Sequence, residues 1–170
     1  TTKIEGVQSD SRYARVTDND VNSGSYSLHL YSTTAGFEFG QAYTVPNLPA
    51  GEYTLSWYIK GSDGNMAFWS NWNENARNVS LTPTVQANGW KKYTAILNID
   101  GVDDTRFLFY ADTAIDCYID DISLTDQSGV NYIIDGGFEE VTIIGSEEEE
   151  NDRYKNELIL SNTTIINNVS

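Results

Sequence analysis

Cationic side chains are scarce in this sequence, which has 10 Lys and Arg residues against 25 Asp and Glu residues and a formal net charge of −15. Proteins bind nucleic acids through cationic contacts to the phosphates, so we expect no nucleic-acid partner. Cysteine is scarcer still. Cys117 is the single one, so it cannot form a disulfide within the chain, and a buried thiol is its ordinary interpretation.

Long apolar runs are also missing. No run reaches the roughly 18 residues that a membrane-spanning helix needs, and no secretion signal opens the sequence. We therefore expect a chain that does not insert into a membrane. Secretion stays open, because a signal peptide would have been removed.

Aromatic residues are what the sequence does have, with 4 Trp and 11 Tyr against one Met and one His. This composition is typical of strands. Short alternating runs, separated by Gly, Pro and Asn turns, are typical of an all-β, two-sheet antiparallel sandwich. The expected strands are residues 13–16, 26–31, 37–45, 53–60, 65–72, 84–86, 90–97, 106–110, 118–124 and 132–134.

Residues 118–124 alternate as a strand and carry two adjacent carboxylates. Strand geometry places Tyr118, Asp120, Ile122 and Leu124 on one face and Asp121 on the other. Asp120 would then face inward, where an ionised carboxylate is costly unless it is paired, capped by N–H groups or bound to a cation. We interpret Asp120 as a ligand of a hard cation, with structural hydrogen bonding as the alternative.

The composition changes after Leu124, and this change suggests three parts. Residues 1–126 would form the sandwich, residues 127–141 a linker with a further strand, and residues 142–170 an acidic extension or docking segment. The alternative for the last part is a solvated tail.

Four runs carry a family resemblance: residues 23–28, 51–62, 89–93 and 118–124. In this order they resemble the jelly-roll carbohydrate-binding modules of the family 4, 9, 16 and 22 type. The resemblance covers roughly residues 10–126 of the sequence. It implies a galactose-binding-like β-sandwich with a C-terminal extension, no catalysis, a structural calcium ion and a glycan groove on a concave sheet. For calcium it points to Asp120, Asp121, a backbone carbonyl near Gly24, and Glu139.

One motif of these modules is displaced. Their opening strand ends in Gly-Gly-Phe-Glu, and the match here is at residues 131–140, after the last strand of the sandwich. Either a second module begins at Asn131, or this segment fills the vacant first-strand position. Because residues 131–170 are too few to complete another module, we expect residues 131–141 to fill that position, within the chain or in a neighbouring copy. Donation to a neighbour would make residues 131–170 a self-association segment and could build a head-to-tail fibre.

A sugar ring is bound by flat aromatic faces flanked by amide, carboxylate and cationic groups. On the expected polar sheet face we predict a set that combines aromatic, cationic and amide side chains: Tyr58, Lys60, Trp69, Asn71, Trp72, Arg106 and Tyr110. Their alternative role is packing under loops or against a partner. Trp57 and Trp90 are expected in the core, and His29 on the surface or in a groove.

The leading functional hypothesis is non-catalytic polysaccharide binding by a calcium-stabilised β-sandwich of a secreted or cell-surface protein. The alternative is a structural subunit of an extracellular fibre or virion appendage assembled by strand donation. We expect no enzyme, because adjacent strand carboxylates point to opposite faces and cannot flank one glycosidic bond. Glycosylation sequons at Asn78, Asn162 and Asn168 agree with an extracellular location.

Overall fold

The computed structural model of the chain describes residues 2–4, 11–45, 48–64, 66–70, 82–102, 105–139, 141–144, 157–160 and 163–165. Side chains are described for residues 11–36, 48–64, 66, 82–102 and 109–139. These parts of the chain form strands, turns and bends and no helix, and therefore none that could span a membrane.

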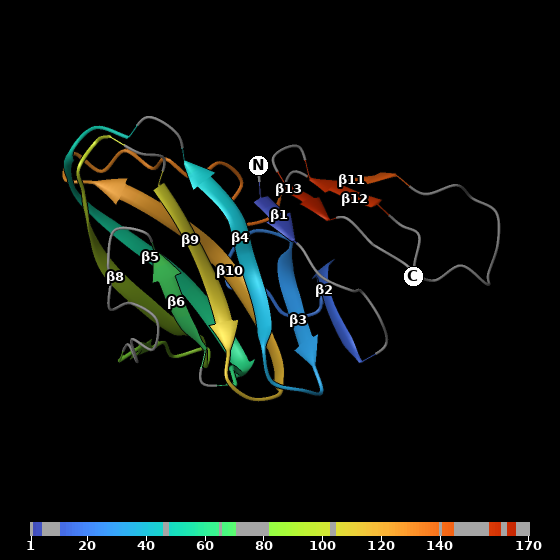
Figure 1. The fold of residues 1–170 in the computed structure, drawn as a ribbon. Helices are drawn as coiled ribbons and strands as arrows, with labels where there is room; N and C mark the ends of the chain where they lie inside the picture. Colours follow the sequence, from blue (N-terminus) through green and yellow to red (C-terminus); the bar gives the residue numbers. More distant parts are fainter. Residues whose placement is uncertain are drawn as a thin grey trace.

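The larger sheet has six antiparallel strands in the order β2-β3-β10-β5-β8-β7. Their bounds are β2 (Arg12–Thr17), β3 (Ser27–Ser32), β5 (Gly51–Ser62), β7 (Thr84–Val85), β8 (Lys91–Ile99) and β10 (Ile115–Asp126). A second antiparallel sheet, in the order β4-β9-β6, comprises β4 (Phe37–Val45), β9 (Thr105–Ala111) and β6 (Ala67–Ser70). In Figure 1 the two sheets overlie each other.

The core lies between these two sheets. Leu55, Trp57 and Ile59 of β5 are buried on the inner face of the six-stranded sheet, as their alternation predicts. Trp57 meets Phe109 of the three-stranded sheet edge to face, with ring centroids 4.8 Å apart. Trp90 and Cys117 are buried as well. The prediction of an all-β, two-sheet antiparallel sandwich is therefore confirmed.

Strands β5 and β6 belong to different sheets, so the turn at residues 61–64 does not join them in a hairpin. Both edges of β5 are already paired, with β10 on one side and β8 on the other. The turn after β5 instead passes to the second sheet, and the Gly64 carbonyl accepts N–H bonds from Asp112 and Thr113 after β9. Gly61 and Gly64 have positive φ angles of 107° and 59°, which favour glycine in this turn.

A β-bulge interrupts β10 between Asp120 and Ser123. Asp120 pairs with Tyr58 and Ser123 with Ser56, so Asp121 and the residue after it oppose one residue of β5. Asp121 has a positive φ of 49°, a conformation that Asp tolerates better than most residues.

The bulge changes which residues of β10 face the core. Ile119 is buried before it, and Ile122 and Leu124 are buried after it. Asp120 follows Ile119 and pairs with Tyr58, so it lies on the outer face with Tyr118. The predicted grouping of Asp120 with Ile122 and Leu124 on one face is therefore wrong, because regular alternation does not continue through a bulge.

Residues 130–138 return along β10 and pack within the same chain. The N–H of Ile122 donates to Gly136, the N–H of Tyr132 to Leu124, and the N–H of Asp126 to Val130. These residues lie beyond the part of β10 that pairs with β3, which ends at Ile119. The segment thus covers an edge of β10 within the chain.

The returning segment is irregular, which contradicts the strand predicted at residues 132–134. Its one backbone bridge joins Thr125 to Asn131, and Asp135 and Phe138 have positive φ angles. Ile133 and Phe138 are nevertheless buried in the main core. Side-chain burial, more than a regular ladder, therefore attaches this segment.

A small sheet in the order β1-β13-β12-β11 joins a strand from the first part of the chain to three from the last part. Its strands are β1 (Thr2–Ile4), β11 (Val141–Ile144), β12 (Glu157–Leu160) and β13 (Thr163–Ile165), with β1 parallel to β13. It lies to one side of the sandwich in Figure 1, and β1 contacts β4. Residues 158–160 and 163–165 are therefore strands, one of the options that their apolar character allowed.

Candidate functional site

The outer face of the six-stranded sheet carries a row of side chains across four neighbouring strands. Arg15 on β2 pairs with His29 on β3, His29 with Tyr118 on β10, and Tyr118 with Lys60 on β5. Tyr58 and Lys92 form the next pair, on β5 and β8. We call the surface formed by these residues with Tyr13, Tyr31 and Asp116 the outer face.

The aromatic rings of the outer face contact one another. His29 stacks on Tyr118, with centroids 4.6 Å apart, and Tyr13 stacks on Tyr31 at 5.1 Å. Tyr13 also meets His29 edge to face at 5.3 Å. Each of the four stacked rings therefore has one face covered by its neighbour. Burial raises the pKa of Tyr118, and Asp116 and Asp20 raise it further, so the phenol keeps its proton.

His29 is held by two neighbours. Its Nε2 lies 2.8 Å from Asp116 Oδ1, and its Nδ1 lies 3.4 Å from the Tyr13 hydroxyl. The prediction that His29 faces away from the core is confirmed, because it lies between the buried residues Leu28 and Leu30 and is itself half-buried. Both ring nitrogens have partners, which fixes the ring orientation.

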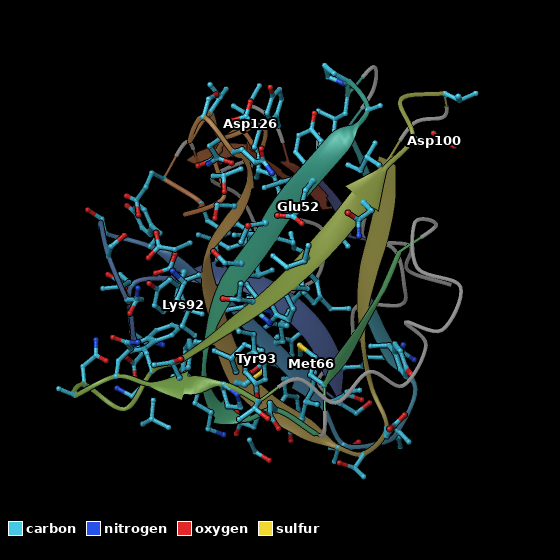
Figure 2. The ribbon with its side chains drawn as sticks, turned by 90° about the vertical axis from the view of Figure 1, so that its left-hand side faces the viewer. Glu52, Met66, Lys92, Tyr93, Asp100 and Asp126 are labelled. Atoms are coloured by element: carbon cyan, nitrogen blue, oxygen red, sulfur yellow. The ribbon has the colours of Figure 1, made fainter. Side chains whose placement is uncertain are left out.

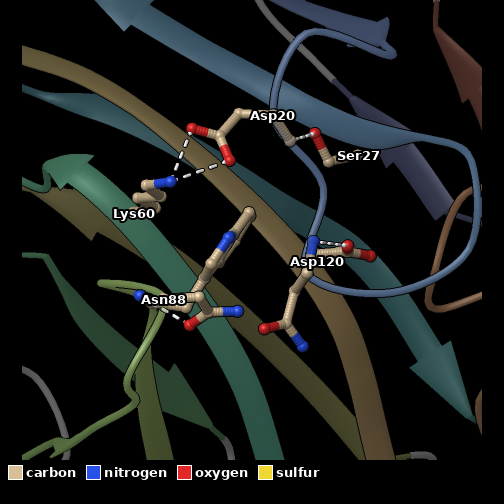
Figure 3. A network of polar contacts seen from close by, with 7 residues as sticks. Asp20, Ser27, Lys60, Asn88 and Asp120 are labelled. Carbon is tan, nitrogen blue, oxygen red and sulfur yellow. Dashed lines mark hydrogen bonds and ion pairs between the residues drawn. The ribbon is translucent and has the colours of Figure 1, made fainter.

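The cations of the outer face differ in their partners. The Lys60 ammonium bridges both oxygens of Asp20, at 3.0 and 2.9 Å, as Figure 3 shows. Arg15 instead lies over the Tyr13 ring, 4.1 Å from its centroid, and Lys92 lies 5.4 Å from the centroid of Tyr58. Among the described residues no carboxylate forms an ion pair with Arg15 or Lys92.

Asp120 is fully buried beneath the loop that joins β2 to β3. Its Oδ2 accepts the backbone N–H groups of Asn22 at 2.8 Å and Ser23 at 3.3 Å, and its Oδ1 accepts that of Asp121 at 2.7 Å. Figure 3 shows this carboxylate close to the loop. The loop, and not the apolar core, therefore buries Asp120.

Asp121 turns toward the same loop. Its Oδ2 accepts the side-chain amide of Asn22 and its Oδ1 the hydroxyl of Ser23, both at 2.7 Å. The prediction that the two adjacent carboxylates point to opposite faces is wrong, because the bulge turns both toward Asn22 and Ser23.

Glu139 reaches the same loop from the returning segment. Its Oε1 accepts the backbone N–H groups of Ser25 at 2.9 Å and Tyr26 at 3.0 Å. Gly24 lies against this carboxylate, since a β-carbon added there would clash with Glu139. A β-carbon at Gly137 would lie 3.5 Å from Asp121 Oδ1 and 3.7 Å from Asp120 Oδ1. All four predicted calcium-ligand positions therefore meet around this loop.

Burial disfavours the ionised form of Asp120 in this acidic cluster. Burial raises the pKa of Asp120 to about 6, Asn22 opposes the shift, and the Asp121 carboxylate adds to it. The ion pairs of the described side chains include none of the three carboxylates. The oxygens are not arranged around one point, however, and the described residues contain no group of three acidic, His or Cys side chains set to hold a metal.

A separate cleft of about 250 Å³ lies between residues 49–53 and 126–132. Asp126 borders it and accepts bonds from Ser128, Val130 and Tyr132, which lower its pKa to about 2. Figure 2 labels Asp126 and Glu52 at this end of the sandwich. The Asp126 carboxylate stabilises its own turn and has little remaining capacity for a ligand.

The sugar-binding residues predicted from the sequence do not share one sheet. Tyr58 and Lys60 lie on the outer face of the six-stranded sheet, whereas Tyr110 belongs to β9 of the three-stranded sheet. Trp69 and Arg106 are also in the three-stranded sheet, on β6 and β9, but their side chains lie outside the described residues. Asn71, Trp72 and the sequons at Asn78, Asn162 and Asn168 lie outside them as well.

Sequence reasoning missed several residues of the outer face: Tyr13, Arg15, Tyr31, Lys92, Asp116 and Tyr118. Alternation with buried neighbours such as Ala14 and Leu30 could have placed most of them on an outer face. The strand order was the missing information, because it brings residues far apart in the sequence into one row.

No protein-family model and no curated protein matches the chain. Three solved structures similar to it are carbohydrate-binding modules. The CBM22-1 xylan-binding domain of Paenibacillus barcinonensis Xyn10C has 16% identity and a TM-score of 0.43. The match covers 71% of this chain and 87% of that domain. The module CBM6cm-2 of Cellvibrio mixtus lichenase 5A, in complex with cellotriose, has 13% identity and a TM-score of 0.37. The match covers 67% of this chain and 89% of that module. The apo module of PbXyn10C has 18% identity and a TM-score of 0.34, and the match covers 74% of this chain and 75% of that module.

Proposed function

We propose that this chain binds a polysaccharide, without catalysis, on the outer face of its six-stranded sheet. The observation that supports this most is the row of Arg15, His29, Tyr118 and Lys60 across four adjacent strands. Phenol hydroxyls and cationic N–H groups are partners that a polyhydroxylated chain requires. A sheet face can offer them to several sugar units at once.

Two features favour binding over hydrolysis. Hydrolysis of a glycosidic bond needs two carboxyl groups that reach the substrate from either side. Asp120 is fully buried and its oxygens accept three backbone N–H groups, so a substrate cannot reach it. The second feature lies on the outer face. There the Asp116 carboxylate contacts His29, and the neighbouring phenol of Tyr118 keeps its proton.

We propose in addition that a calcium ion stabilises the fold at the acidic cluster of Asp120, Asp121 and Glu139, with the carbonyl of Gly24. The clustering of three carboxylates without a cationic side chain supports this, since oxygen ligands are those that calcium prefers. Because the carboxylates now accept N–H bonds from the loop, binding would need a local change in the loop of residues 22–26. The proposed ligand is an extracellular polymer, so the proposal includes a secreted or cell-surface protein.

Affinity electrophoresis tests the proposed binding, with neutral and acidic polysaccharides incorporated in the gel. The double variant Tyr58→Ala/Tyr118→Ala should lose the retardation that the unmodified chain shows, while circular dichroism confirms its fold. Tyr110→Ala is the matched aromatic change on the other sheet and should leave retardation unchanged. Loss of retardation in Tyr110→Ala alone would place the binding surface on the three-stranded sheet. No retardation by any polysaccharide would refute the function.

A further inference from the structure

The cations of the chain are unevenly distributed. The chain has 10 Lys and Arg residues and a formal net charge of −15, yet half of those cations belong to β2, β5 and β8 of the six-stranded sheet. They are Arg12, Arg15, Lys60, Lys91 and Lys92. Of these, Arg15, Lys60 and Lys92 point to the outer face, because each is paired with another residue of that face.

Acidic side chains do not compensate all of this positive charge. Asp20 pairs with Lys60, and Asp116 contacts His29. Lys91, beside Lys92 in sequence, pairs with Asp63 at 3.6 Å. Arg15 and Lys92 therefore remain without a carboxylate partner in the described part of a strongly acidic chain.

The geometry of Arg15 leaves it ready for an anion. The central carbon of its guanidinium lies over the Tyr13 ring, 4.1 Å from the centroid, and no carboxylate of the described residues pairs with it. The N–H donors of a guanidinium lie in its plane, so they remain able to pair with a carboxylate in a bidentate manner. Arg15 is exposed, whereas Lys92 is half-buried beside Tyr58. Figure 2 labels Lys92, and in the strand order its strand β8 lies four places from β2.

We infer that the polysaccharide bound by the outer face is acidic, with uronic-acid carboxylates that pair with Arg15 and Lys92. This inference depends on the proposed carbohydrate binding and specifies its ligand. Strands β2 and β8 are separated by four strand spacings, or about 19 Å, so the two cations contact different units of one chain running across the sheet. Tyr58 and Tyr118 lie between them, and their phenol hydroxyls bond the hydroxyls of the sugar units.

The overall charge of the protein makes this inference specific. At a net charge of −15 the protein repels a polyanion at long range, and the repulsion falls as salt is added. Retention of an acidic polysaccharide therefore needs local cations with fixed positions. Non-specific attraction by the protein as a whole cannot supply it.

Polygalacturonate and the same polymer with its carboxylates methyl-esterified test the inference, because the two probes differ mainly in charge. Isothermal titration calorimetry of the full chain should give about tenfold tighter binding of the acidic form, which corresponds to about 1.4 kcal/mol. Arg15→Gln and Lys92→Gln should each weaken binding of the acidic form several-fold and weaken binding of the esterified form much less, because only the acidic form offers them a carboxylate. Lys91→Gln makes the same change in net charge away from the outer face and should have no effect.

Equal affinity for the two forms would overturn the inference, as would full acidic binding by Arg15→Gln and Lys92→Gln. Binding of neutral polysaccharides alone would also overturn it, and the proposed carbohydrate binding would then stand. Failure of every acidic and neutral polysaccharide to bind would overturn both.

Discussion

The rings of His29 and Tyr118 lie face to face across β3 and β10, with centroids 4.6 Å apart and planes inclined by 16°. They are directly opposed in the strand register, so the contact joins two strands that are far apart in the sequence. This stack forms the centre of the proposed binding row and should contribute to stability as well.

A double-mutant cycle measures that contribution. His29→Ala and Tyr118→Ala should show a coupling of about 0.5–1.5 kcal/mol in urea unfolding, the usual value for an aromatic pair. The same cycle with Tyr118→Ala and Thr94→Ala, two strands away on β8, should show a coupling near zero. Additive effects of the His29 and Tyr118 changes would contradict the stacked arrangement.

The returning segment should be part of the folded core. Phe138 is 1% exposed in the main core, so Phe138→Ala should lower the free energy of unfolding by about 3–5 kcal/mol. Ile134 lies four residues earlier in the same segment and is 64% exposed, so Ile134→Ala should change it by less than about 0.5 kcal/mol. Urea unfolding measures both. Equal, small effects would mean that the segment does not pack on the sandwich.

The buried carboxylate of Asp120 should give the protein an unusual pH dependence. Its pKa is raised from 3.8 to about 6 in the folded state, so between these values the folded protein binds the proton that the unfolded chain has already lost. With calcium removed, the contribution of Asp120 to stability should therefore fall as the pH rises from about 4 to about 6, and then stay level.

The difference in unfolding free energy between the unmodified protein and Asp120→Asn isolates this contribution, because the variant carries no titrating group at that position. The difference should decrease across this pH interval in chelator. A difference that is constant, or that increases with pH, would show that Asp120 is not destabilised by burial. Saturating calcium should remove the decrease, because a bound cation favours the ionised form.

Calcium should raise the melting temperature of the protein. At one hundred times its dissociation constant, a ligand specific for the folded state stabilises it by about 2.7 kcal/mol. Asp121→Asn and Glu139→Gln should each reduce the calcium-dependent shift, because each removes an anionic ligand. Glu52→Gln removes an exposed carboxylate elsewhere and should not alter it. Identical melting curves in chelator and in millimolar calcium would refute the calcium proposal.

Local patterns in the sequence predict the strands well, and for a physical reason. Alternation of apolar and polar residues reports burial on one face, so Leu55, Trp57 and Ile59 are correctly predicted as core. The bulge at Asp121 is harder to predict from the sequence, because two adjacent carboxylates are compatible with regular alternation. One additional residue in β10 then reverses the face of everything that follows it.

The order of the strands in the sheets is the other feature that the sequence does not predict. The run of residues 61–64 looks like a hairpin turn, and only the pairing of both edges of β5 shows that the chain must pass to the other sheet. For the same reason the sequence groups Tyr58 with Trp69 and Tyr110, although their strands lie in different sheets. By contrast, the Gly-Gly-Phe-Glu motif is readable from the sequence, and in the structure the segment that contains it bonds to β10 without forming a strand.

The location of polysaccharide binding is the most direct test of the account. We would titrate the ¹⁵N-labelled protein with an oligosaccharide of the polymer that retards it most strongly and record the amide chemical shifts. Our account predicts shifts concentrated at residues 13–17, 27–31, 58–62 and 116–120, on β2, β3, β5 and β10. Shifts concentrated on β4, β6 and β9, with those four strands unchanged, would contradict it.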